Sequence, residues 1–149
     1  MLRIESFALP HVSAAAALER LCFSVPWTES MLRESLLQPN AFGFCAMEAG
    51  QLAGYAGVIH AAGEGQITNL CVHPEFRGKG IGKTLLQSID EAAIKTGLEC
   101  VFLEVRVSNH AAIGLYESAG YAQIGSRKQY YQAPAEDALV LKKIMGNKD

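Results

Sequence analysis

The sequence predicts a mixed α/β fold, in which helices cover the faces of a sheet that contains both parallel and antiparallel strands. Two observations support this fold class. Four segments place apolar residues at the period of a helix, and six shorter segments are apolar runs or alternate as strands do. Along the chain these segments follow the order ααβββαβαββ. The alternating second half indicates crossover connections, and the consecutive strands on either side of it indicate hairpins.

Capping and stop signals set the boundaries of the four expected helices. Ser13 is expected to cap the first helix, and Thr28 and Asn109 to cap the second and the fourth. Gly97 supplies a C-terminal stop for the third. The expected helices are 13–23, 29–37, 80–96 and 109–119. The inward-facing positions of the first are expected to be Leu18, Leu21 and Cys22.

Six segments are expected to form strands. Ala49-Gly50-Gln51 separates the first two as a hairpin turn, and Ala62-Gly63-Glu64-Gly65 is the expected turn after the second. Between residues 100 and 107, apolar residues alternate with a more polar set that includes Glu104 and Arg106. The expected strands are 42–48, 52–60, 66–72, 100–107, 121–131 and 138–144.

Composition indicates a single domain over residues 1–149. Half of the 149 residues are hydrophobic, and a net charge of −2 gives no overall attraction to nucleic acid or to a membrane surface. No segment approaches the roughly 20 apolar residues of a membrane span, and the N-terminus has no signal-peptide pattern. The four cysteines form no CxxC pair, so we expect no metal site and a reduced, cytoplasmic protein. They are Cys22, Cys45, Cys71 and Cys100, and we expect them to be buried.

The segment Arg77-Gly78-Lys79-Gly80-Ile81-Gly82-Lys83-Thr84 carries the clearest functional signal. Glycines at the start of a helix let backbone N–H groups approach an anion, and three bases surround them, so a phosphate-bearing ligand is indicated. A P-loop would need a glycine where Arg77 stands, and neither register of a dinucleotide fingerprint supplies its third glycine. The alternative interpretation is an ordinary strand-to-helix turn with surface lysines.

The pattern Arg77-x-x-Gly80-x-Gly82 resembles the R/Q-x-x-G-x-G/A signature of the GCN5-related N-acetyltransferases, and the order of elements resembles that family's fold. The resemblance implies that backbone N–H groups of this turn hold the pyrophosphate of acetyl-CoA. It also implies that the backbone of 69–75 pairs with the pantetheine arm, and that Asn109 contacts the same ligand. The residues expected at acetyl-CoA are Leu70, Cys71, Val72, Arg77, Gly78, Lys79, Gly80, Ile81, Gly82, Lys83 and Asn109.

Two further residues are candidates for catalysis. Glu104 stands on the less apolar face of its strand, where a carboxylate is solvated, paired with Arg106 or directed into a site. Tyr116 is either a core aromatic or a functional phenol. The segments around them resemble a branch of the family that acetylates the N-terminal alanine of the eighteenth small-subunit ribosomal protein. That resemblance implies that Glu104 is the base and Tyr116 the acid in a direct attack without an acetyl-enzyme.

The sequence indicates the acceptor less clearly than the donor, acetyl-CoA. The resemblance implies a ribosomal-protein N-terminal peptide, with no need for direct contact to nucleic acid. Trp27, Tyr130 and Tyr131 stand in segments that border the acceptor in the family, although burial explains them equally well. Another protein N-terminus, a lysine or a small amine remains open as acceptor. A non-catalytic acyl-CoA sensor and a nucleotide-binding protein that uses Gly82-Lys83-Thr84 also remain open.

Overall fold

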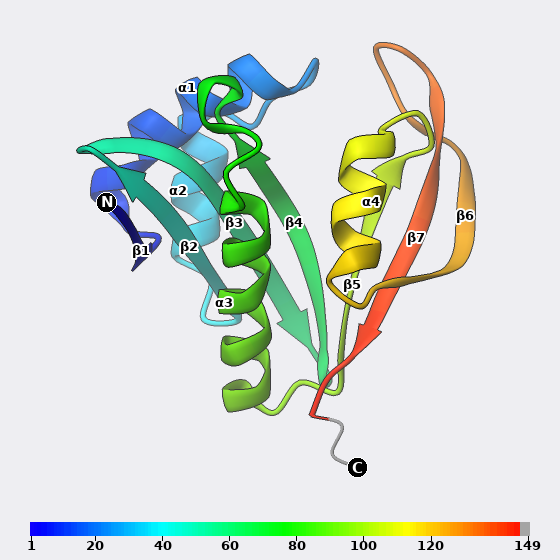
Figure 1. Ribbon diagram of the computed structural model, residues 1–149. Coiled ribbons are helices and arrows are strands. Elements are labelled where there is room, and N and C mark those ends of the chain that lie inside the picture. Colours follow the sequence, from blue (N-terminus) through cyan, green and yellow to red (C-terminus); the bar gives the residue numbers. More distant parts are fainter. Residues whose placement is uncertain (147–149) are drawn as a thin grey trace.

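The computed structural model describes residues 1–146, and residues 147–149 of the expected domain lie outside them. Its seven-stranded sheet has the order β1-β2-β3-β4-β5-β7-β6, which confirms the mixed α/β fold (Figure 1). The strands are β1 (Leu2–Ser6), β2 (Ala41–Glu48), β3 (Gln51–Ala61), β4 (Glu64–Val72), β5 (Cys100–Arg106), β6 (Ala122–Tyr131) and β7 (Glu136–Ile144). The helices are α1 (Val12–Cys22), α2 (Glu29–Leu36), α3 (Ile81–Thr96) and α4 (His110–Ser118), with short 3-10 turns at Leu9–His11 and Pro74–Phe76.

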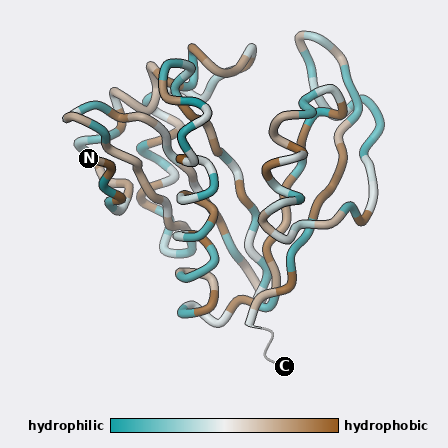
Figure 2. Tube along the Cα trace, in the orientation of Figure 1, coloured by the Kyte–Doolittle hydropathy of each residue, from teal (hydrophilic) through white to brown (hydrophobic). Residues whose placement is uncertain are grey.

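Helices cover both faces of the sheet. One buried cluster joins α3 and α4 to the apolar side of β5, and its central side chains include Leu85, Leu86 and Leu103. A second cluster joins α1 and α2 to the opposite face and includes Leu18, Leu32 and Tyr55. Figure 2 shows that β6, one of the two edge strands, is largely hydrophilic, and most of its residues are exposed.

The sheet divides between β4 and β5. These strands are parallel and pair only over Glu64–Gln66 and Cys100–Phe102, and beyond that point they diverge (Figure 1). Other neighbouring strands pair antiparallel over longer stretches. We call residues 67–72 of β4 and 103–106 of β5 the splayed segments. Their facing edges have no strand partner in the described chain, so their backbone groups are available to a ligand.

A β-bulge in β4 changes which face its later residues occupy. Asn69 pairs with Gly57 and Ile67 pairs with Val58, so Thr68 is the extra residue. Ile67 packs in the α3 cluster, whereas Cys71, four residues on, packs in the α1 cluster. In an uninterrupted strand these two side chains would share a face. The bulge therefore turns Cys71 toward α1, while Leu70 and Val72 pack on the α3 side.

Several expectations about the ends of elements are confirmed. Thr28 accepts a hydrogen bond from the backbone N–H of Met31, and Asn109 accepts one from that of Ala112, so both act as N-caps. Gly97 ends α3 with a φ of +82°. The predicted hairpins and the crossover through α3 are also present.

Other expectations are wrong. Strand β1 was not predicted, although Leu2 and Ile4 alternate with charged residues as a strand requires. Ser13 lies inside α1, and its hydroxyl donates to Glu29 instead of capping the helix. Leu21, expected to face inward, is 59% exposed. Gly65, expected in a turn, is part of β4 and pairs with His60 of β3, because Ala62 and Gly63 alone form the turn between the two strands.

Candidate active site

The glycine-rich turn forms an anion-binding geometry at the start of α3. Gly78 and Gly80 both have a φ of +80°, in the left-handed region that favours glycine, and Gly80 is the N-cap residue. The backbone N–H groups of residues 78–83 have no acceptor within residues 1–146. Several N–H groups therefore converge at the positive end of the helix dipole, which suits a phosphate.

The three bases beside this turn are not equivalent. Arg77 folds back onto β4, where its Nε donates to the carbonyl of Val72 at 3.1 Å and its Nη2 lies 3.6 Å from the thiol of Cys22. Lys79 is exposed, with its Nζ 5.3 Å from the centre of the Phe76 ring. Lys83 is exposed on the first turn of α3. Arg77 therefore connects the turn to the end of β4, and the two lysines face solvent.

The remaining residues expected at acetyl-CoA lie on or beside the splayed segments. Leu70 and Val72 turn their side chains to the α3 cluster, and Cys71 turns to α1, so the backbone of β4 is what faces the divergence. Ile81 and Gly82 are buried at the start of α3. A Cβ on Gly82 would come within 2.8 Å of Leu115, so this glycine also allows α3 and α4 to approach closely.

The side chain of Asn109 is engaged at the start of α4. Its Oδ1 accepts the backbone N–H of Ala112 at 3.2 Å, which is its capping bond. Thr84, which would serve a nucleotide-bound metal in a P-loop, donates its hydroxyl to the carbonyl of Gly80 at 2.9 Å. Among residues 1–146, no three His, Cys, Asp or Glu side chains form a cluster that could hold a metal ion.

Glu104 lies in β5 with a side chain that is only 7% exposed. Its Oε1 accepts a hydrogen bond from Gln66 Nε2 at 2.8 Å, and its Oε2 accepts one from Arg127 Nε at 3.1 Å. Pairing with Arg106, one of the alternatives, is wrong: Arg106 pairs with Glu136 at 3.1 Å. The two bonds to Glu104 occupy about half of the lone-pair sites on a carboxylate, so it can still accept a proton or a water hydrogen.

Tyr116 is buried on α4, with its ring edge-to-face on Tyr121 at a centroid distance of 5.8 Å. Burial raises the pKa of Tyr116 well above its ordinary value, with smaller contributions from Tyr131 and Cys71. Burial, Tyr130 and Glu104 raise the pKa of Tyr131 to about 12. Tyr131 therefore contributes to the raised pKa of Tyr116, and Glu104 contributes to that of Tyr131.

The two tyrosines of the last hairpin have different environments. Tyr130 is 46% exposed and lies 5.9 Å from the guanidinium of Arg127. Tyr131 is half-buried, 4.6 Å from the guanidinium of Arg106. Cation–π contacts of this kind hold arginine and ring together. The hairpin therefore brings one exposed aromatic ring next to the arginine that pairs with Glu104.

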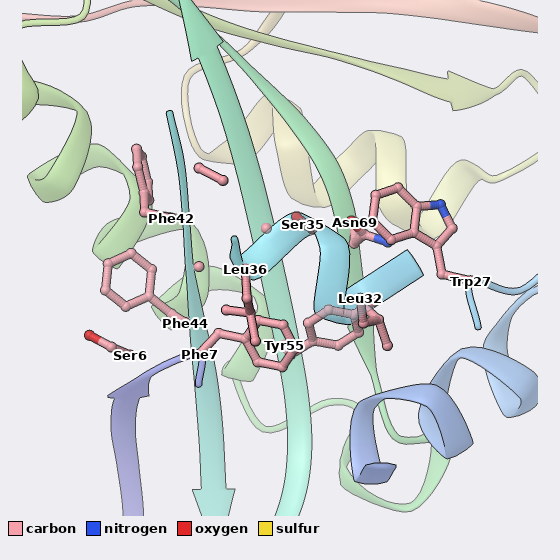
Figure 3. Close-up of a pocket in the computed structure, with 13 residues that line it drawn as sticks. Ser6, Phe7, Trp27, Leu32, Ser35, Leu36, Phe42, Phe44, Tyr55 and Asn69 are labelled. Atoms are coloured by element: carbon pink, nitrogen blue, oxygen red, sulfur yellow. The ribbon is translucent and has the colours of Figure 1, made fainter. Parts of the chain in front are cut away.

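A pocket of about 280 Å³ opens on the α1–α2 face of the sheet. Figure 3 shows Trp27 and Asn69 at one end of it, with Tyr55 and Leu32 along its floor and Phe42 at the other end. Trp27 is half-buried, so its exposure is compatible both with a contact to the acceptor and with packing between the helices. Leu103 and Val105 pack in the α3 cluster, so the alternation of side chains along β5 directs Glu104 to the opposite face of the sheet. The α1 cluster and the pocket lie on that face.

Sequence reasoning did not single out Glu19, a fully buried carboxylate on α1 at 1% exposure. It accepts hydrogen bonds from the backbone N–H of Trp27 at 2.9 Å, from Asn69 Nδ2 at 3.0 Å and from the Tyr55 hydroxyl. It therefore connects the α1–α2 loop to the bulged part of β4. Its helical spacing from Ala15 and Ala16 on the inward face was the available signal. Gln66 and Arg127, the partners of Glu104, were also missed.

Comparison with known proteins gives the family of this chain. A profile described as "Acetyltransferase (GNAT) family" matches residues 12–121. The chain belongs to the GNAT family of acetyltransferases.

Individual relatives are similar along most of their length. A Bacillus subtilis protein, provisionally named as a ribosomal protein bS18-alanine N-acetyltransferase, is 37% identical over 139 residues, 93% of this chain and 92% of that one. N-alpha-acetyltransferase RimI of Mycobacterium tuberculosis is 32% identical over 126 residues, 82% of this chain and 78% of that one. The crystal structure of the ribosomal-protein-S18-alanine N-acetyltransferase from Escherichia coli matches with a TM-score of 0.91 at 28% identity, and covers 100% of this chain and 97% of that one.

No helix within residues 1–146 combines the length and the apolar character that crossing a membrane requires.

Proposed function

We propose that this chain transfers the acetyl group of acetyl-CoA to the α-amino group of a protein N-terminus, with the N-terminal alanine of ribosomal protein bS18 as acceptor. The observation that carries the proposal is the similarity, along almost the whole chain, to proteins named for this reaction. Its place of action is then the cytoplasm, where ribosomal proteins are made. The proposed reaction uses no metal ion.

The donor half of the site consists largely of backbone. In the proposal, the N–H groups of residues 78–83 bind the pyrophosphate, and the unpaired edge of the splayed β4 segment binds the pantetheine arm. The arm lies between β4 and β5, so the thioester reaches the part of β5 that carries Glu104. Lys79 and Lys83 add positive charge at the solvent side of the turn.

The chemistry needs one proton acceptor and one proton donor. An α-ammonium group has a pKa of about 7.7–8.0, against about 10.4 for lysine, so a modest base suffices. Glu104 accepts that proton, directly or through a water. The free amine then attacks the thioester carbon, the nitrogen of the tetrahedral intermediate loses a second proton to water, and the intermediate collapses to the amide as the C–S bond breaks. Tyr116 gives its phenolic proton to the departing sulfur, and its raised pKa ensures that this proton is present at neutral pH.

The acceptor peptide enters in this proposal from the α1–α2 face. The pocket beside Trp27 and the exposed ring of Tyr130 provide apolar contacts on that face. Arg127 connects Tyr130 to Glu104, so a peptide that contacts the hairpin also lies beside the base. In this proposal, selectivity for an N-terminal α-amine over a lysine side-chain amine depends on the distance from the peptide contacts to Glu104.

The test is acetylation of a synthetic peptide with the bS18 N-terminal sequence, followed by mass spectrometry and tandem fragmentation. We expect one acetyl group on the α-amine, and none on the same peptide with a blocked N-terminus. Acetylation of lysine side chains alone would contradict the proposed acceptor. Binding of acetyl-CoA without turnover would contradict catalysis and favour the sensor.

Variants test the two roles separately. Glu104→Gln and Tyr116→Phe should each lower kcat by about 10²- to 10⁴-fold, the usual contribution of a general acid or base. One matched control is Glu117→Gln, an exposed carboxylate on α4. The other is Tyr121→Phe, because the Tyr121 ring packs on Tyr116 and its buried hydroxyl has no hydrogen-bond partner within residues 1–146. Near wild-type kcat in either catalytic variant would contradict the role of that residue.

A further inference from the structure

Two thiols meet where the end of α1 lies against the end of β4. Cys22 is the last residue of α1, and its Sγ lies 3.6 Å from the carbonyl oxygen of Val72. Cys71 precedes Val72, and the bulge at Thr68 turns the Cys71 side chain toward α1. Cys22 also packs against the buried α1 cluster that contains Cys71, and each thiol affects the pKa of the other. The proposed catalytic steps use neither of them.

The two thiols differ in exposure and in charge environment. Cys22 is half-buried, whereas Cys71 is 4% exposed. The Nη2 of Arg77 lies 3.6 Å from the Cys22 sulfur. The hydrogen bond from Cys71 and the Arg77 guanidinium together lower the pKa of Cys22 to about 7, and the pKa of Cys71 is raised. Cys22 is therefore the more accessible and the more acidic of the two thiols.

The other two cysteines do not share these properties. Cys45 and Cys100 are buried, and burial raises the pKa of both thiols, that of Cys45 to about 12. Neither has a cation in hydrogen-bond contact with its sulfur in the described chain. A thiol of this kind is inert to mild oxidants.

We propose that Cys22 and Cys71 are an oxidation-sensitive pair that closes to a disulfide beside the acetyl-CoA strand and weakens acetyl-CoA binding. The oxidant is a hydroperoxide. The effect on acetyl-CoA rests on the proposed function, but disulfide formation does not.

The chemistry proceeds in two balanced steps. The Cys22 thiolate attacks the hydroperoxide, the O–O bond breaks, and the departing oxygen takes a proton to leave as water or an alcohol. Cys22 is then a sulfenic acid. The Cys71 sulfur attacks the Cys22 sulfur, the S–O bond breaks, and the hydroxide leaves as water with the proton of Cys71. Two thiols have lost two electrons in total, which reduce one hydroperoxide.

The disulfide changes the contacts of Arg77. This arginine contacts the Cys22 sulfur and the carbonyl of Val72 at the end of β4. Oxidation changes the sulfur that Arg77 contacts and ties α1 to the strand whose backbone is proposed to bind the pantetheine arm. We therefore expect the KM for acetyl-CoA to rise several-fold while kcat changes little, because within residues 1–146 neither sulfur is hydrogen-bonded to Glu104 or Tyr116.

The test maps cysteines after treatment of the whole protein with one equivalent of hydrogen peroxide. Free thiols are alkylated and peptides are analysed by mass spectrometry. We expect a peptide linked between Cys22 and Cys71, absent after treatment with dithiothreitol. In Cys71→Ala, the Cys22 sulfenic acid should persist and react with dimedone. The matched control Cys100→Ala should form the same linked peptide as the unaltered chain.

Two outcomes would overturn the inference. Retention of both free thiols in folded protein, under peroxide that oxidises a reference low-pKa thiol, would refute the pair as a redox site. A linked peptide with an unchanged acetyl-CoA dissociation constant, measured by calorimetry, would refute its effect on the ligand. Neither measurement needs acetyl transfer, so failure of the proposed function would be seen separately, in the peptide acetylation assay.

Discussion

Replacement of Glu19 by alanine tests how strongly the loop between α1 and α2 is held to the sheet. The carboxylate is buried and accepts three hydrogen bonds, from Trp27, Asn69 and the hydroxyl of Tyr55. In Glu19→Ala all three donors remain inside the protein with no acceptor. The substitution therefore creates three unpaired polar groups at once, in addition to removing a side chain.

The expected loss of stability is large. Each buried donor left unpaired costs about 1–3 kcal/mol, and relaxation toward the adjacent pocket favours the lower values, so we expect a total of about 4 kcal/mol. A domain of this size has a total stability of about 5–15 kcal/mol, so the variant should remain folded only marginally. Tyr55→Phe removes one donor and should cost about 1–2 kcal/mol. The double variant should cost less than the sum, because no tyrosine hydroxyl is then left unpaired.

Urea unfolding followed by circular dichroism measures these differences. Fluorescence of Trp27, the single tryptophan of the chain, adds a local report on the loop. The control is Glu91→Ala, an exposed carboxylate on α3, which should change stability by less than about 0.5 kcal/mol. A loss in Glu19→Ala no greater than that of the control would refute the reasoning that the three bonds hold the loop.

Two further substitutions test packing and pH dependence. In Gly54→Ala the new Cβ would meet the carbonyl oxygen of Cys71 at 2.9 Å, a backbone atom that cannot move freely, so we expect a loss of about 1–3 kcal/mol in urea unfolding. Gly125→Ala, with nothing within 4 Å, is its control and should be nearly neutral. Glu136 has a pKa below the usual 4.5, because it accepts hydrogen bonds from Ser108 and an arginine. Glu136 therefore stabilises the folded protein above pH 4.5, and this stabilisation is lost as the pH falls through the folded-state pKa of Glu136. The melting temperature of Glu136→Gln should fall less on acidification than that of the unaltered protein. Equal acid dependence of the two proteins would contradict this.

The sequence predicted most of the helices and strands because their signals are local. Caps such as Thr28 and Asn109 act on N–H groups two or three residues away, so the chain itself shows both partners. Strand β1 has a comparably local alternation but is short, and it is stabilised by pairing with β2, some forty residues further along the chain. Ser13 carried the right residue type for a cap, but it lies two residues after the N-cap residue, His11.

The candidate site was harder to predict where partners are distant along the chain. Glu104 was singled out from its place in an alternating strand, but its partners Gln66 and Arg127 are 38 and 23 residues away. They meet it because β5 lies between β4 and the β7–β6 hairpin, an order that no local pattern states. Glu19 stood at a recognisable inward-facing position, but its partners Trp27, Tyr55 and Asn69 are 8, 36 and 50 residues away. The bulge at Thr68 depends on pairing with β3, and it decides which face Cys71 occupies.

The divergence of β4 from β5 also bears on how the protein responds to heat and to solvent exchange. Three residue pairs join the two strands, so the two parts of the sheet are joined by a narrow stretch of hydrogen bonds. Amide hydrogens on the facing edges of residues 67–72 and 103–106 should exchange with solvent faster than those of β2 and β3. A bound pantetheine arm would serve as the missing strand, and saturation at 100 times the dissociation constant would add about 2.7 kcal/mol to the folded state. Acetyl-CoA would in this way complete the sheet as well as supply the acetyl group.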